Sequence, residues 1–121
     1  DPLSSRYEVW DIQWCRWLDN TIRHNANPRT ADKKFIFFIC HSFQLACRHL
    51  NLGMVCKRHS TAFGVFPIHL LPGSESEPIL QGLNDPFYAV DSRDFQVIHP
   101  NDQRLEEMGG KALCLEKELI N

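Results

Sequence analysis

The first regular pattern in the chain is a helical spacing of large apolar residues. Ser5 and Glu8 have the spacing of a capping box at a helix start. Beyond them, apolar side chains recur at steps of three and four, at Trp10, Trp14, Trp17, Leu18 and Ile22. This spacing predicts a helix with one apolar face, which needs a sheet or another chain to pack against. We expect the helix to end near Asn25, because the following NANPRT is rich in helix breakers.

The second pattern is a short apolar run followed by another helical segment. Residues 34–39 are almost continuously apolar over the length of a strand, which is typical of a strand buried on both faces in a parallel sheet. Residues 42–50 then have the pattern of a helix, which we expect Gly53 to stop.

The rest of the chain alternates strand patterns with turns. The segments GMVCKR, TAFGVFPIHLL, PFYAVDS and KALCLEKE are each predicted to be strands. PGSESEP is predicted to be a turn, PILQGL a short helical turn and NDQRLEEMGG a short helix or loop. This order predicts an α/β domain, a three-layer sandwich with a mainly parallel sheet and a local antiparallel excursion.

Composition narrows the class of protein. The chain has 121 residues, of which 43% are hydrophobic and 23% charged, and its net charge is −2, which fits one globular domain. No basic face indicates a nucleic acid partner. The longest apolar run is far shorter than the roughly 20 residues that span a bilayer, and no signal peptide is visible. We therefore expect a cytoplasmic protein with neither nucleic acid nor membrane as a partner.

The cysteines predict free thiols. There are five of them, an odd number at irregular spacing, which argues against a disulfide framework. Cys40 has a special place because it lies between the predicted central strand and the helix after it. A sharp turn there lifts the side chain out of the sheet, and the helix N-terminus favours the thiolate. The next backbone N–H points to where an oxyanion would form. The alternative is a buried structural cysteine.

The segment FICHSFQLA resembles the nucleophile segment of class I glutamine amidotransferases, G-I-C-x-G-x-Q, with Ile39, Cys40 and Gln44 as the matching residues. The opening DPLSS resembles the end of that family's oxyanion loop, and FGVFPIHLL resembles the stretch after its nucleophile helix. PILQGLNDPFYAVDSRDFQVIHP resembles the stretch that ends in S-H-x-D-x-V and a proline. The likeness covers nearly the whole chain in the right order and is closest to the glutaminase domain of GMP synthases.

The resemblance implies a flavodoxin-like fold and a glutaminase. Cys40 would attack the side-chain amide of glutamine, giving a glutamyl thioester and ammonia, with the oxyanion held by the backbone N–H of His41. It also implies that the substrate glutamine is bound by Gln44, Ser92, Asp94 and Phe95. No cofactor is implied, and the partner would be a synthetase domain or subunit that accepts the ammonia.

The chain departs from the family at three positions. Phe38 and Ser42 replace the two glycines around the nucleophile, and Arg93 stands where the family often has histidine. Homoserine O-acyltransferases, which have H-I-C-W-A-A-Q and then E-K-x-F-G-V-F, also lack these glycines, and FICHSFQ and AFGVF resemble them. Thr61 and Ala62 occupy the neighbourhood of E-K-x, so that family's lysine is not matched. Acyl transfer from an acyl-CoA remains the alternative reaction.

A cysteine nucleophile normally needs a histidine oriented by a carboxylate, which this family supplies from an H-P-E segment. His99 precedes a proline, but Asn101 follows, and no H-x-E occurs in the chain. We expect residues 1–121 to be the central and C-terminal part of one amidotransferase-like domain, with the base beyond Asn121. A non-catalytic binding domain is the other possibility.

Two pairs of Cys and His residues are candidates for a zinc site. Cys47 with His49 and Cys56 with His59 are residue types that bind zinc. The first pair has only one intervening residue and would point apart on a helix. We therefore expect no metal site.

Overall fold

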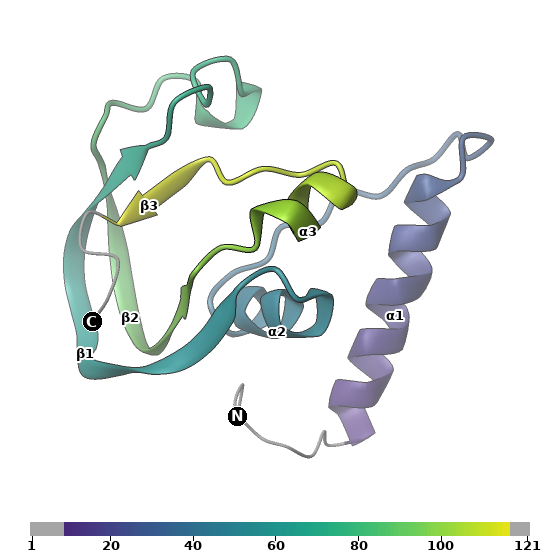
Figure 1. Ribbon diagram of the computed structural model, residues 1–121, viewed down its shortest axis with the longest axis horizontal. Coiled ribbons are helices and arrows are strands. Elements are labelled where there is room, and N and C mark those ends of the chain that lie inside the picture. Colours follow the sequence, from purple (N-terminus) through teal and green to yellow (C-terminus); the bar gives the residue numbers. More distant parts are fainter. Residues whose placement is uncertain (1–8, 117–121) are drawn as a thin grey trace.

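The computed structural model describes residues 9–116 of the chain. Figure 1 shows a curved sheet on one side, the long first helix on the opposite side, and two shorter helices between them. The elements in chain order are α1 (Val9–Ala26), α2 (His41–Leu50), β1 (Met54–Leu70), η1 (Pro78–Leu80), β2 (Phe87–Ile98), α3 (Asp102–Glu107) and β3 (Cys114–Glu116).

The sheet is antiparallel throughout. Its strand order is β2-β1-β3, and β1 pairs with β2 over most of its length, for example with Val65 opposite Val90. The register shifts between Lys57 and Ala62, so the two segments predicted as separate strands form the single long strand β1. The third strand is short and pairs only with the end of β1, where Ile68 lies opposite Glu116. Consecutive strands joined by local connections give this antiparallel arrangement directly.

The prediction of a three-layer, mainly parallel sandwich is therefore wrong. Residues 34–39 form no strand and pair with no strand of the described chain. Phe35 is fully exposed at 101%, and Phe37 and Ile39 are 75% and 67% exposed. The error has a physical cause: continuous apolarity shows that a segment can be buried on both faces, but it does not show which strands lie beside it.

Helix α1 buries a narrower face than the tryptophan pattern predicts. Leu18 is only 1% exposed, whereas Trp10 and Trp17 remain 54% and 47% exposed. The buried positions of α1 are Asp11, Cys15, Leu18 and Thr21. The predicted capping residue Ser5 lies outside the described residues, while the observed end at Ala26 agrees with the predicted stop near Asn25. The face that was expected to be covered is thus only partly covered.

Asn25 ties the end of α1 to the apolar segment that follows it. Its side-chain amide donates to the carbonyl oxygen of Lys34 at 2.9 Å, and its Oδ1 accepts from the Lys34 backbone N–H at 2.8 Å. Trp14 adds an edge-to-face contact with Phe38, with ring centroids 6.1 Å apart. Residues 34–38 are therefore held along α1 on one side.

Helix α2 lies against β1 and β2, and its end is fixed by α3. Asn51, rather than the predicted Gly53, adopts the left-handed conformation that ends α2, with φ at 57°. Gly53 serves packing instead, because an added Cβ would come within 2.8 Å of Val97 Cγ1. From α3, Arg104 Nε donates to the carbonyl oxygen of Leu50 at 3.0 Å. These contacts hold α2, and with it the turn at its start, against the sheet.

Candidate functional site

The turn before α2 holds Cys40 in a strained backbone conformation. Its φ and ψ are 52° and −107°, outside the regions that residues with a side chain normally occupy. Such a conformation costs of order 1–3 kcal/mol and persists only where surrounding contacts impose it. The thiol is exposed, and the helix starts at the next residue. The prediction that Cys40 lies in a sharp turn directly before a helix is confirmed.

Ser42 is the contact that closes this turn. Its hydroxyl accepts from the Ile39 backbone N–H at 2.9 Å and donates to the Ile39 carbonyl oxygen at 3.0 Å. The backbone N–H of Ser42 also donates to the Ile39 carbonyl, at 3.2 Å. The chain is thus fixed by hydrogen bonds on both sides of Cys40.

The start of α2 presents backbone donors beside the thiol. Gln44 N–H donates to the Cys40 carbonyl at 3.0 Å, whereas the N–H groups of His41 and Phe43 donate to no acceptor within residues 9–116. Free N–H groups at the first turn of a helix, together with its dipole, favour a negative charge there. The His41 ring is exposed and faces Trp10, with ring centroids 6.5 Å apart. The backbone N–H of His41 thus lies at the start of α2 beside Cys40, while its ring lies against Trp10.

Gln44 lies one turn into α2 and is 5% exposed. Its side-chain amide makes no hydrogen bond with another residue of the described chain. An amide with two donors and an acceptor that finds no protein partner keeps its hydrogen-bonding capacity for a ligand or for water. The Gln44 backbone thus lies one helical turn from Cys40, and its side-chain amide has no hydrogen-bond partner among residues 9–116. Its part in binding glutamine stays a prediction.

The other three predicted binding residues lie on β2. Ser92 and Asp94 are exposed and Phe95 is half-buried. Asp94 Oδ1 accepts a hydrogen bond of 2.5 Å from the Thr61 hydroxyl across the hairpin. Among the described contacts, none joins any of these three residues to Cys40. The structure therefore brings together Cys40, His41 and Gln44, and leaves the β2 group as a separate set.

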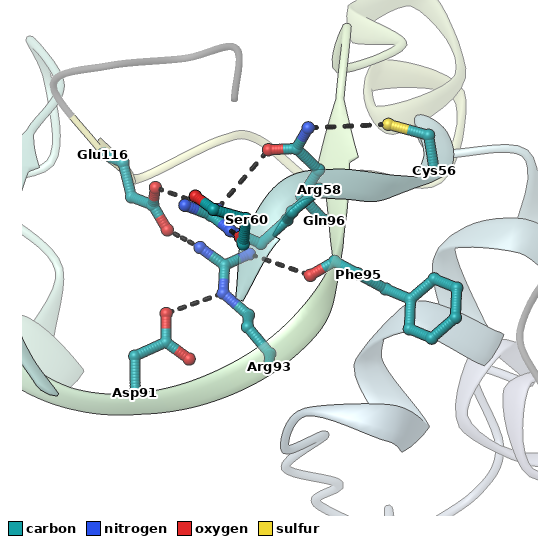
Figure 2. Close-up of polar contacts among 8 residues, drawn as sticks. All are labelled: Cys56, Arg58, Ser60, Asp91, Arg93, Phe95, Gln96 and Glu116. Carbon is teal, nitrogen blue, oxygen red and sulfur yellow. Dashed lines mark hydrogen bonds and ion pairs between the residues drawn. The ribbon is translucent and has the colours of Figure 1, made fainter. Parts of the chain in front are cut away.

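An arginine network lies on the sheet beside that group (Figure 2). Arg93 Nε donates to Asp91 Oδ2 at 2.6 Å, and its Nη2 pairs with Glu116 from β3. Arg93 Nη1 also donates to the carbonyl oxygen of Phe95, at 3.5 Å. Arg58 Nη1 lies 3.6 Å from Glu116 Oε2, so one carboxylate joins arginines from two strands.

Arg58 is the more buried of the two arginines, with 8% of its side chain exposed against 18% for Arg93. Burial lowers its pKa, and the neighbouring Arg93 lowers it further. Its Nη1 donates to Gln96 Oε1 at 3.4 Å, and Gln96 Nε2 donates to Cys56 Sγ at 3.6 Å. The sequence analysis missed this network. The alternation of Asp91 and Arg93 along a strand was a usable signal, because residues two apart share a face.

Burial disfavours ionisation of three of the thiols, those of Cys15, Cys47 and Cys114. It raises the pKa of Cys47 to about 11, and it raises the pKa of Cys15 and Cys114 as well, with Asp19 and Asp11 adding to the rise at Cys15. Thiols with raised pKa values are poor nucleophiles, since the thiolate is the reactive form. All five cysteines are free.

Residues 9–116 hold no group of three or more His, Cys, Asp or Glu that could bind a metal ion. No helix in that range is both long enough and apolar enough to cross a bilayer. No family model, curated protein or solved structure matches the chain.

Proposed function

We propose that the chain acts as a glutaminase of the amidotransferase type, with Cys40 as the nucleophile. The observation that carries this proposal is the strained, exposed Cys40 at the N-terminus of α2. A cysteine that only filled space would be buried in an unstrained conformation. Strain held at an exposed thiol is typical of a functional turn.

The reaction has two steps. Cys40 Sγ attacks the side-chain carbonyl carbon of glutamine, its proton passes to the departing nitrogen, and the C–N bond breaks to release ammonia. Water then attacks the thioester carbon, the C–S bond breaks, and glutamate leaves while the thiol regains a proton. The N–H groups of His41 and Phe43 donate to no acceptor within residues 9–116, so they can stabilise the oxyanion of each tetrahedral intermediate.

Gln44 would take part in substrate binding. Its unused side-chain amide can donate to, and accept from, the α-amino and α-carboxylate groups of a bound glutamine. Loss of one such hydrogen bond weakens binding by about 0.5–1.5 kcal/mol, which is about two- to tenfold. Gln44→Ala should therefore raise KM more than it lowers kcat.

Ammonia release from glutamine tests the proposal. The complete protein that contains residues 1–121 should release ammonia from glutamine, its Cys40→Ala variant should fall to the rate of buffer alone, and its Cys56→Ala variant should keep the wild-type rate. The same preparations are given an acyl-CoA in place of glutamine. Full ammonia release by Cys40→Ala, or acylation of Cys40 by acyl-CoA without any reaction with glutamine, would reject the glutaminase.

A further inference from the structure

Strand β2 forms an edge of the sheet. In the strand order β2-β1-β3, β1 lies on one side of β2, and no strand within residues 9–116 lies on the other side. The register shift of the hairpin falls in β1, between Lys57 and Ala62, while β2 runs continuously from Phe87 to Ile98. An edge strand of this length presents a row of backbone N–H and C=O groups with which a further strand can pair.

The charges of β2 are placed evenly about its middle. Exposure alternates along the strand, and the exposed side chains are those of Tyr88, Val90, Ser92 and Asp94. Asp91 and Arg93 lie on the opposite, half-buried face, because residues two apart on a strand share a face. Arg93 Nε donates to Asp91 Oδ2 at 2.6 Å. The strand therefore carries one negative and one positive side chain, one on either side of Ser92.

This order of charges is complementary to itself. If two copies of β2 pair antiparallel about Ser92, each Asp91 lies directly opposite Arg93 of the second copy. The four charges then alternate in sign, so that each has an opposite charge beside it along the strand and across to the other strand. Pairing about Asp91 or about Arg93 instead puts two like charges directly opposite each other, which is destabilising. The charges thus favour a second copy of this chain as the partner of the edge, in one register.

We propose that two copies of this chain associate through their β2 strands, paired antiparallel about Ser92. The dimer has twofold symmetry, so every contact occurs twice, and the two sheets join into one. Pairing of one strand from each copy buries less surface than tight complexes do, so we expect association at roughly micromolar concentration. This inference does not depend on the reaction of Cys40.

Opposite charges at Val90 test the register. In the proposed dimer Val90 lies opposite Asp94 of the second copy, and it is 84% exposed, so a substitution there leaves the core intact. Val90→Lys should strengthen association and Val90→Glu should weaken it, each by about two- to thirtyfold in Kd, because two such pairs form in each dimer. Sedimentation velocity of the complete protein that contains residues 1–121, over a range of concentrations, gives these Kd values.

Val65 of β1 supplies the matched control. It is 62% exposed and lies beside Val90 in the hairpin, one strand further from the second copy. Val65→Lys and Val65→Glu change the net charge as the Val90 variants do. At physiological ionic strength, where charges more than about 8 Å apart are largely screened, these two variants should have similar Kd values.

Cysteine cross-linking locates the symmetry axis. Residues directly opposite each other in an antiparallel pair have Cα atoms about 4.5–5.5 Å apart, a separation that a disulfide spans. In a Cys40→Ala background, which removes the exposed native thiol, oxidation of Ser92→Cys should give a covalent dimer. Val90→Cys and Asp94→Cys should each give none alone, whereas a mixture of the two should give one.

The proposal is overturned by any of three results. The first is a protein that stays monomeric well above micromolar concentration. The second is a dimer whose Kd is the same in Val90→Lys and Val90→Glu, which would place the interface elsewhere. The third is a covalent dimer formed by Val90→Cys alone but not by Ser92→Cys, which would contradict the register.

Discussion

The Ser42 hydroxyl makes two hydrogen bonds to the backbone of Ile39: it accepts from the Ile39 N–H at 2.9 Å and donates to the Ile39 carbonyl oxygen at 3.0 Å. The backbone hydrogen bond from Ser42 to Ile39 closes the same turn at 3.2 Å. Because these contacts fix the chain on either side of Cys40, the strained φ of 52° is imposed by local structure. The turn at Cys40 is therefore built by residues 39–42 themselves.

The two hydrogen bonds of the Ser42 hydroxyl, called here the Ser42 clamp, predict that Ser42→Ala is less stable than the wild type. Each neutral hydrogen bond contributes about 0.5–1.5 kcal/mol, and partial exposure favours the low end. We expect the free energy of unfolding in urea to fall by about 1 kcal/mol. Ser76→Ala, in an exposed loop position, is the control and should change stability by less than about 0.5 kcal/mol. An unchanged midpoint in Ser42→Ala would show that the clamp does not hold the turn.

Strain at Cys40 predicts that glycine at this position gives a more stable protein than alanine, the reverse of the usual order. At ordinary positions alanine is more stable than glycine, because glycine loses more backbone freedom on folding. At Cys40 the glycine variant should be more stable than Cys40→Ala by about 1 kcal/mol, since glycine tolerates the positive φ. The same pair at Cys56, within β1, should show the usual order. A Cys40→Gly variant that is less stable than Cys40→Ala would mean that the backbone there is not strained.

The buried thiol of Cys47 predicts a loss of stability at high pH. Its pKa is about 11 in the folded chain, against an ordinary value of 9.0. Because the folded pKa is raised, the neutral thiol stabilises the fold fully below pH 9.0, and this contribution is lost as the pH rises toward about 11. The slope from this group is about 1.4 kcal/mol per pH unit.

The measurement compares wild type with Cys47→Ala by urea unfolding at several pH values from 8 to 11. Other groups titrate in both proteins, so the difference between the two curves isolates Cys47. Cys47→Ala should be less stable near pH 8, because it leaves a cavity, but its stability should fall less steeply above pH 9.0. Parallel curves would show that the thiol ionises as easily in the folded chain as in the unfolded one.

The arginine network predicts that substitutions of Arg93 and Asp91 have non-additive effects on the free energy of unfolding. Arg93→Gln leaves Asp91 and Glu116 without their shared partner in a largely buried place, so it should lower the free energy of unfolding by about 2 kcal/mol. Asp91→Asn combined with Arg93→Gln should cost less than the sum of the two single changes, which a double-mutant cycle measures. Arg29→Gln, at an exposed arginine, is the control. Strict additivity would show that the network is not coupled.

Local patterns predicted most of the secondary structure. Signals within a few residues predicted α2 to within one residue, the short helical turn at Pro78–Leu80 and the start of β2. The strand was predicted over residues 86–92 only and extends to Ile98. The sheet could not be predicted in the same way, because strand neighbours are set by contacts distant in sequence. Residues 34–39 illustrate this, since a strong strand pattern found no partner strand within the described chain.

The site was predictable where its parts are adjacent in sequence. Cys40, His41 and Gln44 lie on one turn, so a motif of seven letters places them together. Arg58, Arg93 and Glu116 come from three strands, and no local pattern indicates that they meet. The left-handed end of α2 at Asn51 was missed for another reason. Glycine is the usual residue at such a helix end, so the sequence analysis placed the end at Gly53.

The most direct test of the central claim is covalent labelling with 6-diazo-5-oxo-norleucine, an electrophile shaped like glutamine. The 121-residue chain is incubated with it, and the adduct is located by peptide mass spectrometry, with Cys40→Ala and Cys47→Ala as matched variants. We predict one adduct, on Cys40, that excess glutamine suppresses and that persists in Cys47→Ala. Labelling spread over several cysteines, or labelling of Cys40 that glutamine does not reduce, would contradict the account.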